Sequence, residues 1–145
     1  MDSIGKLPWG KEKDFLTDFS KSPWQRISPK TLERRIQDYP LTRELIEGIL
    51  DDYIEEIILK KEGYCLLPSS VRTFTLFVQE YPKDIQDFEI GVIHELIHLI
   101  YRVQGNSIIG SKDNDLIESI IEKTARKFQE KNSGYISKKL DEIYR

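Results

Sequence analysis

Residues 90–100 read IGVIHELIHLI, and this stretch decides the fold. Apart from His94, Glu95 and His98, its residues are apolar or glycine. We interpret it as part of a long helix over residues 83–102 that is mostly buried, with Gly105 as the residue that stops it. Two histidines and a glutamate in such a helix are costly to bury unless something pairs with them.

His94, Glu95 and His98 form an H-E-x-x-H motif. Positions i and i+4 of a helix lie on one face, one turn apart, so both imidazoles can reach one metal ion at about 2.0–2.1 Å. Glu95 lies roughly 100° around the helix from His94, beside the metal, where it can polarise a bound water. These are the only two histidines of the chain, and both stand at metal-ligand spacing.

The motif has only three fixed positions and occurs by chance in many proteins, so a plain helical domain with a chance motif is one alternative. A zinc site needs a third ligand, and without a further histidine this must be a carboxylate from another segment. Glu118 fits, because it follows a loop long enough to turn the chain back and lies early in the next expected helix. Asp113 and Asp115 are rival ligands. Glu118 and Glu122 can also be an acidic pair on a solvated helix face.

Residues 118–122 read ESIIE, which places Glu122 one turn after Glu118 on the same face. Together with the histidine motif, this resembles the gluzincins, the thermolysin-like zinc peptidases. They carry a glutamate ligand on a second helix and a carboxylate one turn later, where aspartate is commoner than glutamate. The resemblance implies that Glu118 is the third zinc ligand and that Glu122 hydrogen-bonds His94. Such a partner fixes the tautomer and orientation of a ligating imidazole.

The resemblance covers residues 71–128 and not the first 60 residues. The small size of the chain is most similar to the minigluzincins, stripped-down members that their own C-terminal segments hold latent. The repressor-cleaving metallopeptidases of mobile elements are a second relative with the same two-helix site. Their small-residue pattern on the glutamate helix is only partly present here, at Thr124 and Ala125.

The function that the resemblance implies is a zinc metalloendopeptidase, a hydrolase that takes a peptide or protein substrate and uses Zn²⁺ as cofactor. Glu95 is then the general base that accepts a proton from the metal-bound water. The strand expected at 71–80 would pair along its exposed edge with the substrate main chain. Tyr101, Tyr135 and Tyr144 are candidates for a second group that stabilises the oxyanion. The alternative function is a catalytically silent zinc-binding or protein-interaction module with the same fold.

The remaining elements complete an α+β fold, in which a small sheet packs on the active-site helix and the glutamate helix. Further helices are expected at 11–19, 29–38, 42–61, 115–131 and 135–145, and adjacent strands at 64–67 and 71–80. We expect one domain over 1–145, with a helical N-terminal layer at 1–62, a catalytic core at 63–131 and a tail at 132–145. Two arrangements are open: the tail or the N-terminal segment covers the cleft and holds the enzyme latent, or the tail docks on the far side.

Composition limits the partners of this chain of 145 residues. A net charge of −3, with acids and bases interspersed, provides no basic surface, so we expect no nucleic-acid partner. We expect no secretory signal, because the N-terminus has no basic region followed by an apolar stretch. We expect no membrane partner, because no apolar run approaches the roughly 20 residues that span a bilayer. The single cysteine, Cys65, permits no internal disulfide and favours the cytoplasm. The oligomeric state and the cleavage preference stay open.

Overall fold

The computed structural model describes residues 27–68, 73–103 and 112–144, together with the side chains of these residues except 68, 112–114, 143 and 144. This part of the chain has the predicted α+β fold, with five helices and one three-stranded mixed sheet. In chain order the elements are α2 (Pro29–Asp38), α3 (Arg43–Asp52), β1 (Ile54–Lys60), β2 (Cys65–Pro68), β3 (Phe74–Gln79), α4 (Ile85–Ile100), α5 (Lys112–Lys131) and α6 (Tyr135–Tyr144). The helix predicted at 11–19 lies outside the described residues.

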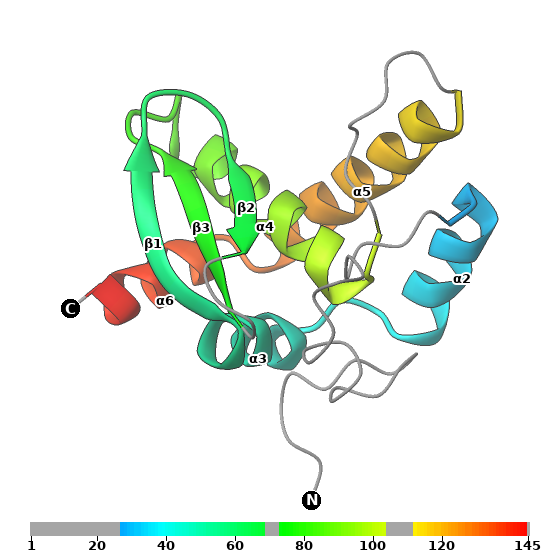
Figure 1. Ribbon diagram of the computed structural model, residues 1–145, viewed down its shortest axis with the longest axis horizontal. Helices are drawn as coiled ribbons and strands as arrows, with labels where there is room; N and C mark the ends of the chain where they lie inside the picture. The colour runs from blue at the N-terminus through cyan, green and yellow to red at the C-terminus, as the bar shows by residue number, and fades with distance from the viewer. Residues whose placement is uncertain (1–26, 69–72, 104–111, 145) are drawn as a thin grey trace, which may run out of the picture.

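Helix α4 is the predicted central helix, and the rest of the described chain is arranged around it (Figure 1). Asp84 begins it as the N-cap, because its side chain accepts a hydrogen bond from the backbone N–H of Asp87. The sheet, α3, α5 and α6 all pack against it, and α2 packs on the outer side of α5. Its apolar residues from Ile90 to Ile100 are accordingly buried, with Val92, Ile93, Leu96 and Ile97 fully inaccessible to solvent.

The sheet has the strand order β1-β3-β2, with β1 parallel and β2 antiparallel to β3. The predicted pair of adjacent strands is therefore confirmed as β2 and β3. Alternate residues of β3, Phe74, Leu76 and Val78, point into the core and are at most 1 % exposed. The prediction that this strand offers a free edge to a substrate was wrong. β3 has a strand on each side, so its backbone groups are already paired, and the outer strands of the described sheet are β1 and β2.

The helix predicted over 42–61 is correct only in its first half. Thr42 caps it as expected, by accepting a hydrogen bond from the N–H of Leu45, but the helix ends at Asp52 and the chain continues as strand β1. Apolar residues at positions 54, 57 and 58 fit one face of a helix, and this spacing suggested a continuation. Their β-branched side chains also suit a strand, and backbone pairing with β3 favours that conformation. The N-terminal layer is therefore not entirely helical.

The start of β2 packs closely against the first half of α4. The ring of Tyr64, the residue before β2, lies against Phe88 with 6.3 Å between ring centroids. The same ring fills the space beside Gly91, where a Cβ atom would lie 2.3 Å from Tyr64 Cε1. Position 91 therefore requires glycine for this close approach. Cys65 follows as a half-buried strand residue, which agrees with its predicted place in a strand.

Helix α6, the predicted tail helix, docks on α4, and its residues Ile136 and Leu140 are 1 % and 3 % exposed. Its first turn is held by Glu89 of α4, a fully buried carboxylate that accepts hydrogen bonds from the backbone N–H groups of Gly134 and Ser137. Glu89 precedes His94 by five residues, which is about 140° around the helix. The tail therefore lies on the side of α4 that faces away from His94, as in the second of the two predicted arrangements.

No helix among the described residues combines the length and the apolar composition that crossing a membrane requires.

We predict that Glu89 makes the stability of the fold depend on pH. Burial acts to raise the pKa of Glu89, but hydrogen bonds from Gln129, Gly134 and Ser137 outweigh it and hold the pKa below its ordinary value. The carboxylate therefore stabilises the folded state above about pH 4.5, and this contribution is lost as the pH falls through the lowered pKa. Glu89→Gln should lower the free energy of unfolding by about 2 kcal/mol at neutral pH.

The measurement is urea unfolding of the wild type and the variant between pH 7 and roughly pH 3, where the difference between them should shrink with acid. Glu130→Gln, an exposed position on α5, is the matched control and should leave the profile unchanged. A difference that stays constant with pH would contradict the assignment.

Candidate metal centre

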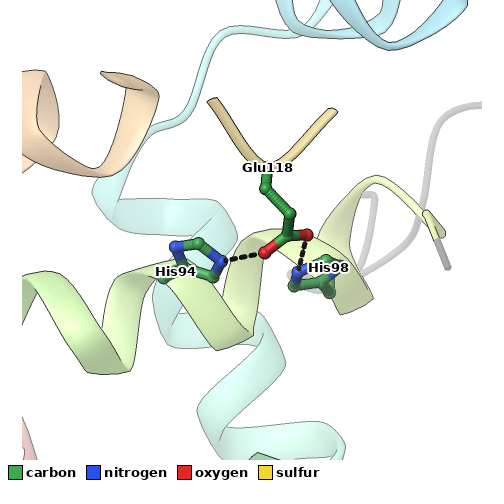
Figure 2. A group of neighbouring side chains, drawn as sticks. All are labelled: His94, His98 and Glu118. Carbon is green, nitrogen blue, oxygen red and sulfur yellow. Dashed lines mark hydrogen bonds and ion pairs between the residues drawn. The ribbon is translucent and has the colours of Figure 1, made fainter. Parts of the chain in front are cut away.

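Helices α4 and α5 pack as an antiparallel pair, and their contact brings three candidate ligands to one point. His94 and His98 lie one turn apart on α4, and Glu118 reaches between their rings from α5 (Figure 2). The Nε2 atom of His94 is 3.0 Å from Oε1 of Glu118, and the Nε2 atom of His98 is 3.2 Å from Oε2. One ligand atom of each residue lies within 4.8 Å of the other two.

A second contact fixes the orientation of each imidazole. The Nδ1 atom of His94 is 3.1 Å from Oε1 of Glu122, and the other carboxylate oxygen of Glu122 pairs with Arg126 at 2.8 Å. The Nδ1 atom of His98 is 3.0 Å from the backbone oxygen of Val103. In a neutral imidazole whose Nδ1 donates to an oxygen, Nε2 carries no hydrogen, and this is the form that binds a metal. Both Nε2 atoms point at Glu118.

The contact with Val103 depends on an unusual end of α4. Arg102 has a φ of 55°, in the left-handed region that a residue other than glycine seldom adopts. The chain turns back there, and the N–H of Val103 donates to the carbonyl oxygen of His98 at 3.0 Å. This turn brings the carbonyl of Val103 to the ring of the same histidine. The turn that ends α4 therefore fixes the ring orientation of His98, which lies in the last turn of the helix.

The three candidate ligands are largely shielded from water. The side chains of His94, His98 and Glu118 are 17 %, 9 % and 29 % exposed. Burial acts to raise the pKa of Glu118, but its contacts with His94 and His98 outweigh burial and lower the pKa to about 2. Burial likewise acts to lower the pKa of His94, and the contacts with Glu118 and Glu122 outweigh it and raise the pKa. Glu118 is therefore ionised at neutral pH, as a ligand has to be.

The donor set fits a divalent zinc ion. Two imidazole nitrogens and one carboxylate oxygen, with a fourth position open to water, are the ligands of a catalytic zinc site. Among the described residues, the buried oxygen Oε2 of Glu118 has no well-formed hydrogen bond, although Nε2 of His98 lies 3.2 Å away. An unsatisfied buried carboxylate oxygen is costly, and a cation held between the three side chains would satisfy it.

Glu95, the predicted general base, is half-buried beside this group and does not belong to it. Burial raises the pKa of Glu95, and the negative charge of Glu118 adds to this effect, whereas the two histidines oppose it. The net direction is upward, so Glu95 holds a proton more readily than an ordinary glutamate. That property suits a group that has to accept a proton and release it again.

The other predicted site residues lie elsewhere. Asp115 is exposed and takes no part in the group, and the side chains of Asp113 and Tyr144 lie outside the described residues. Tyr101 is fully buried, and its hydroxyl donates to the backbone oxygen of Tyr39 at 2.6 Å, so it joins the end of α4 to the segment after α2.

Tyr135 is also engaged away from the site, because its hydroxyl donates to Glu47 of α3. Neither Tyr101 nor Tyr135 therefore reaches the metal centre with its hydroxyl.

Sequence reasoning missed three residues of the centre: Arg102, Val103 and Arg126. The i,i+4 spacing of Glu122 and Arg126 was available as a signal for their ion pair. No signal pointed to Val103, because the contact is made by its backbone and follows a left-handed residue that is arginine instead of glycine.

Comparison of the chain with known proteins finds no matching family model, no matching curated protein and no matching solved structure.

We predict that one zinc ion binds per chain, and that His98→Ala or Glu118→Ala abolishes stoichiometric binding, because each change leaves only two ligands. Metal content of the purified variants, measured by elemental analysis, tests this. Glu130→Ala on the exposed side of α5 is the control and should retain zinc. Stoichiometric zinc in the double variant His94→Ala/His98→Ala would refute the site.

Glu122 should affect zinc affinity only through His94. Glu122→Ala removes the acceptor at Nδ1 and should weaken zinc binding about 10- to 100-fold. Glu122→Gln keeps a side-chain oxygen that can accept the same hydrogen bond, so it should lose much less. Competition with a chromogenic chelator measures both affinities. Equal losses in the two variants would mean that the charge of Glu122 matters and that the hydrogen bond does not.

Proposed function

We propose that this protein is a zinc-dependent metallopeptidase of the gluzincin type. The single observation that carries the proposal is the convergence of His94, His98 and Glu118 on one point, with Glu122 on the far side of the first imidazole. A pair of acidic residues on a solvated helix face would not meet two histidines in this way. The motif, the second helix and the carboxylate one turn later agree with the gluzincin arrangement in both sequence order and geometry.

The roles of the residues follow from their positions. His94, His98 and Glu118 would hold the ion, while Glu122 and the carbonyl of Val103 keep the two rings in the metal-binding tautomer. Zinc bound there supplies Lewis acidity, which lowers the pKa of a coordinated water and polarises a substrate carbonyl. The largely buried surroundings strengthen these electrostatic effects.

Glu95 moves the proton in this proposal. Its carboxylate takes a proton from the attacking water and then delivers it to the nitrogen of the departing amine. Its raised pKa favours the first half of this transfer, because a carboxylate with an ordinary pKa would accept the proton less readily. The substrate is a peptide or protein, since the chemistry requires a scissile amide beside Glu95.

The proposed compartment is the cytoplasm. Cys65 is a free thiol in the structure and the only cysteine of the chain, which is the usual situation in a reducing environment.

The decisive variant is Glu95→Gln. Glutamine keeps the size and polarity of the side chain but has no carboxylate to accept the proton, so zinc should stay bound and hydrolysis should fall at least 100-fold. The assay is digestion of a broad peptide library followed by mass spectrometry, with zinc content measured on the same samples. Glu130→Gln is the control and should cleave like the wild type.

Two outcomes would reject the proposal in different ways. Zinc-loaded wild-type protein that cleaves no peptide would point to a catalytically silent zinc-binding module. Unchanged cleavage by Glu95→Gln would leave a peptidase with a different general base.

A further inference from the structure

A groove of about 650 Å³ runs between α2 and α5, on the outer side of α5. Part of its lining is apolar and comes from both helices and from the segment that follows α2. These apolar residues are Ile36, Leu41, Ile120 and Phe128. Phe128 is buried, but Ile36, Leu41 and Ile120 are only partly buried, so apolar surface stays accessible in the groove.

Three lysines stand in a row along the α5 wall of this groove. Lys123, Lys127 and Lys131 follow one another at four-residue spacing, so each lies one turn after the last. All three are exposed, and their side chains take part in no ion pair or hydrogen bond in the part of the chain that the structure describes. Among the described residues of the lining only Glu33, on the α2 wall, is acidic, and it is not paired with them.

The lysine row is unfavourable for α5 on its own, because like charges four residues apart on a helix repel each other. The helix dipole favours a cation in the last turn, which accounts for Lys131, but this effect does not reach Lys123, two turns earlier. Elsewhere on the same helix an acid does precede a base by four residues, and Glu122 and Arg126 form an ion pair of 2.8 Å. Acids also outnumber bases in the whole chain, 25 to 22, so composition does not explain a row without acids.

The groove lies on the side of α5 that is turned away from the metal centre. Lys127 follows Glu118 by nine residues, which is about 180° around the helix. Glu118 points at the histidines of α4, whereas Ile120 and Lys127 line the groove beside α2. A molecule bound in the groove therefore leaves the candidate metal ligands uncovered.

We propose that this groove docks an acidic amphipathic helix of a partner protein. The apolar face of the partner helix lies on Ile36, Ile120 and Phe128, and its aspartate or glutamate side chains, at four-residue spacing, lie opposite the lysine row. Two helices side by side form the kind of apolar groove in which amphipathic helices bind, and the charge of the row selects acidic ones. The inference does not depend on the proposed peptidase function, because the groove is separate from the metal centre.

The test measures the binding of fluorescein-labelled peptides to the full-length chain by fluorescence anisotropy. Three peptides of about 18 residues, enough for five helical turns, are compared. The first has leucine on one helical face and glutamate beside it, the second has glutamine in place of the glutamate, and the third is a scrambled version of the first without an apolar face. The first peptide should bind at least about tenfold more tightly than either of the others at roughly 0.1 M salt.

Reversing the charge of the row should remove this preference. The triple variant Lys123→Glu/Lys127→Glu/Lys131→Glu should bind the acidic amphipathic peptide at least about tenfold more weakly than the wild type. The matched control makes the same change of net charge at three exposed lysines outside the groove, and it should change the affinity less than about twofold. The control variant is Lys30→Glu/Lys83→Glu/Lys138→Glu.

Methyl NMR on the wild-type protein locates the peptide independently of any variant. The signals of Ile36 and Ile120 should shift when the acidic amphipathic peptide is added, because their side chains line the groove. The signal of Ile93, which is fully buried in α4, should not move.

Equal affinity for the three peptides, equal weakening in the two triple variants or unshifted signals of Ile36 and Ile120 would each overturn the inference. Displacement of the peptide by an equal concentration of duplex DNA would assign the lysine row to nucleic acid and would also overturn it. So would a full-length chain that binds none of the peptides, as expected if another part of the chain or a second copy of it fills the groove.

Discussion

Burial of α4 forces the polar groups on this helix to find partners inside the protein. Glu89 is satisfied by the first turn of α6 and by Gln129, with which it forms a hydrogen bond of 3.0 Å. His94 and His98 share the carboxylate of Glu118. These contacts join α4 to two of its neighbouring helices, since α5 supplies Glu118 and Gln129, and the start of α6 with the residue before it supplies the backbone donors. Contacts with Glu89, His94 and His98, the polar side chains in the buried part of α4, thus help to fix how α5 and α6 pack against it.

Local signals in the sequence predicted much of this arrangement. Ser28 and Thr42 accept hydrogen bonds as N-caps where the sequence indicated helix starts, and the central helix lies within the predicted range. The meeting of the histidines with a carboxylate of the next helix was also expected, because a zinc site needs a third ligand and the chain has no other histidine. Spacing alone could not choose between Glu118 and its rivals Asp113 and Asp115, and that choice came from the resemblance to gluzincins. The bound metal and the peptidase activity stay predictions.

Features that depend on contacts distant in the sequence were not predictable. The apolar positions of 54–60 fit a helix as well as a strand, and only pairing with β3 decides between them. The strand order places β3 in the centre, although its sequence is equally compatible with an edge. Arg102 had no distinguishing pattern, because its significance depends on a backbone angle.

The mixed sheet implies an order of assembly. β2 and β3 are neighbours along the chain and pair antiparallel, so they can associate by closing a short loop. β1 pairs parallel with β3 and must wait for the chain to pass through β2, which makes it the later strand to join. Among its seven residues only Ile57 is buried, so little apolar surface holds it in place. Amide hydrogens of β1 should accordingly exchange with solvent sooner than those of β3.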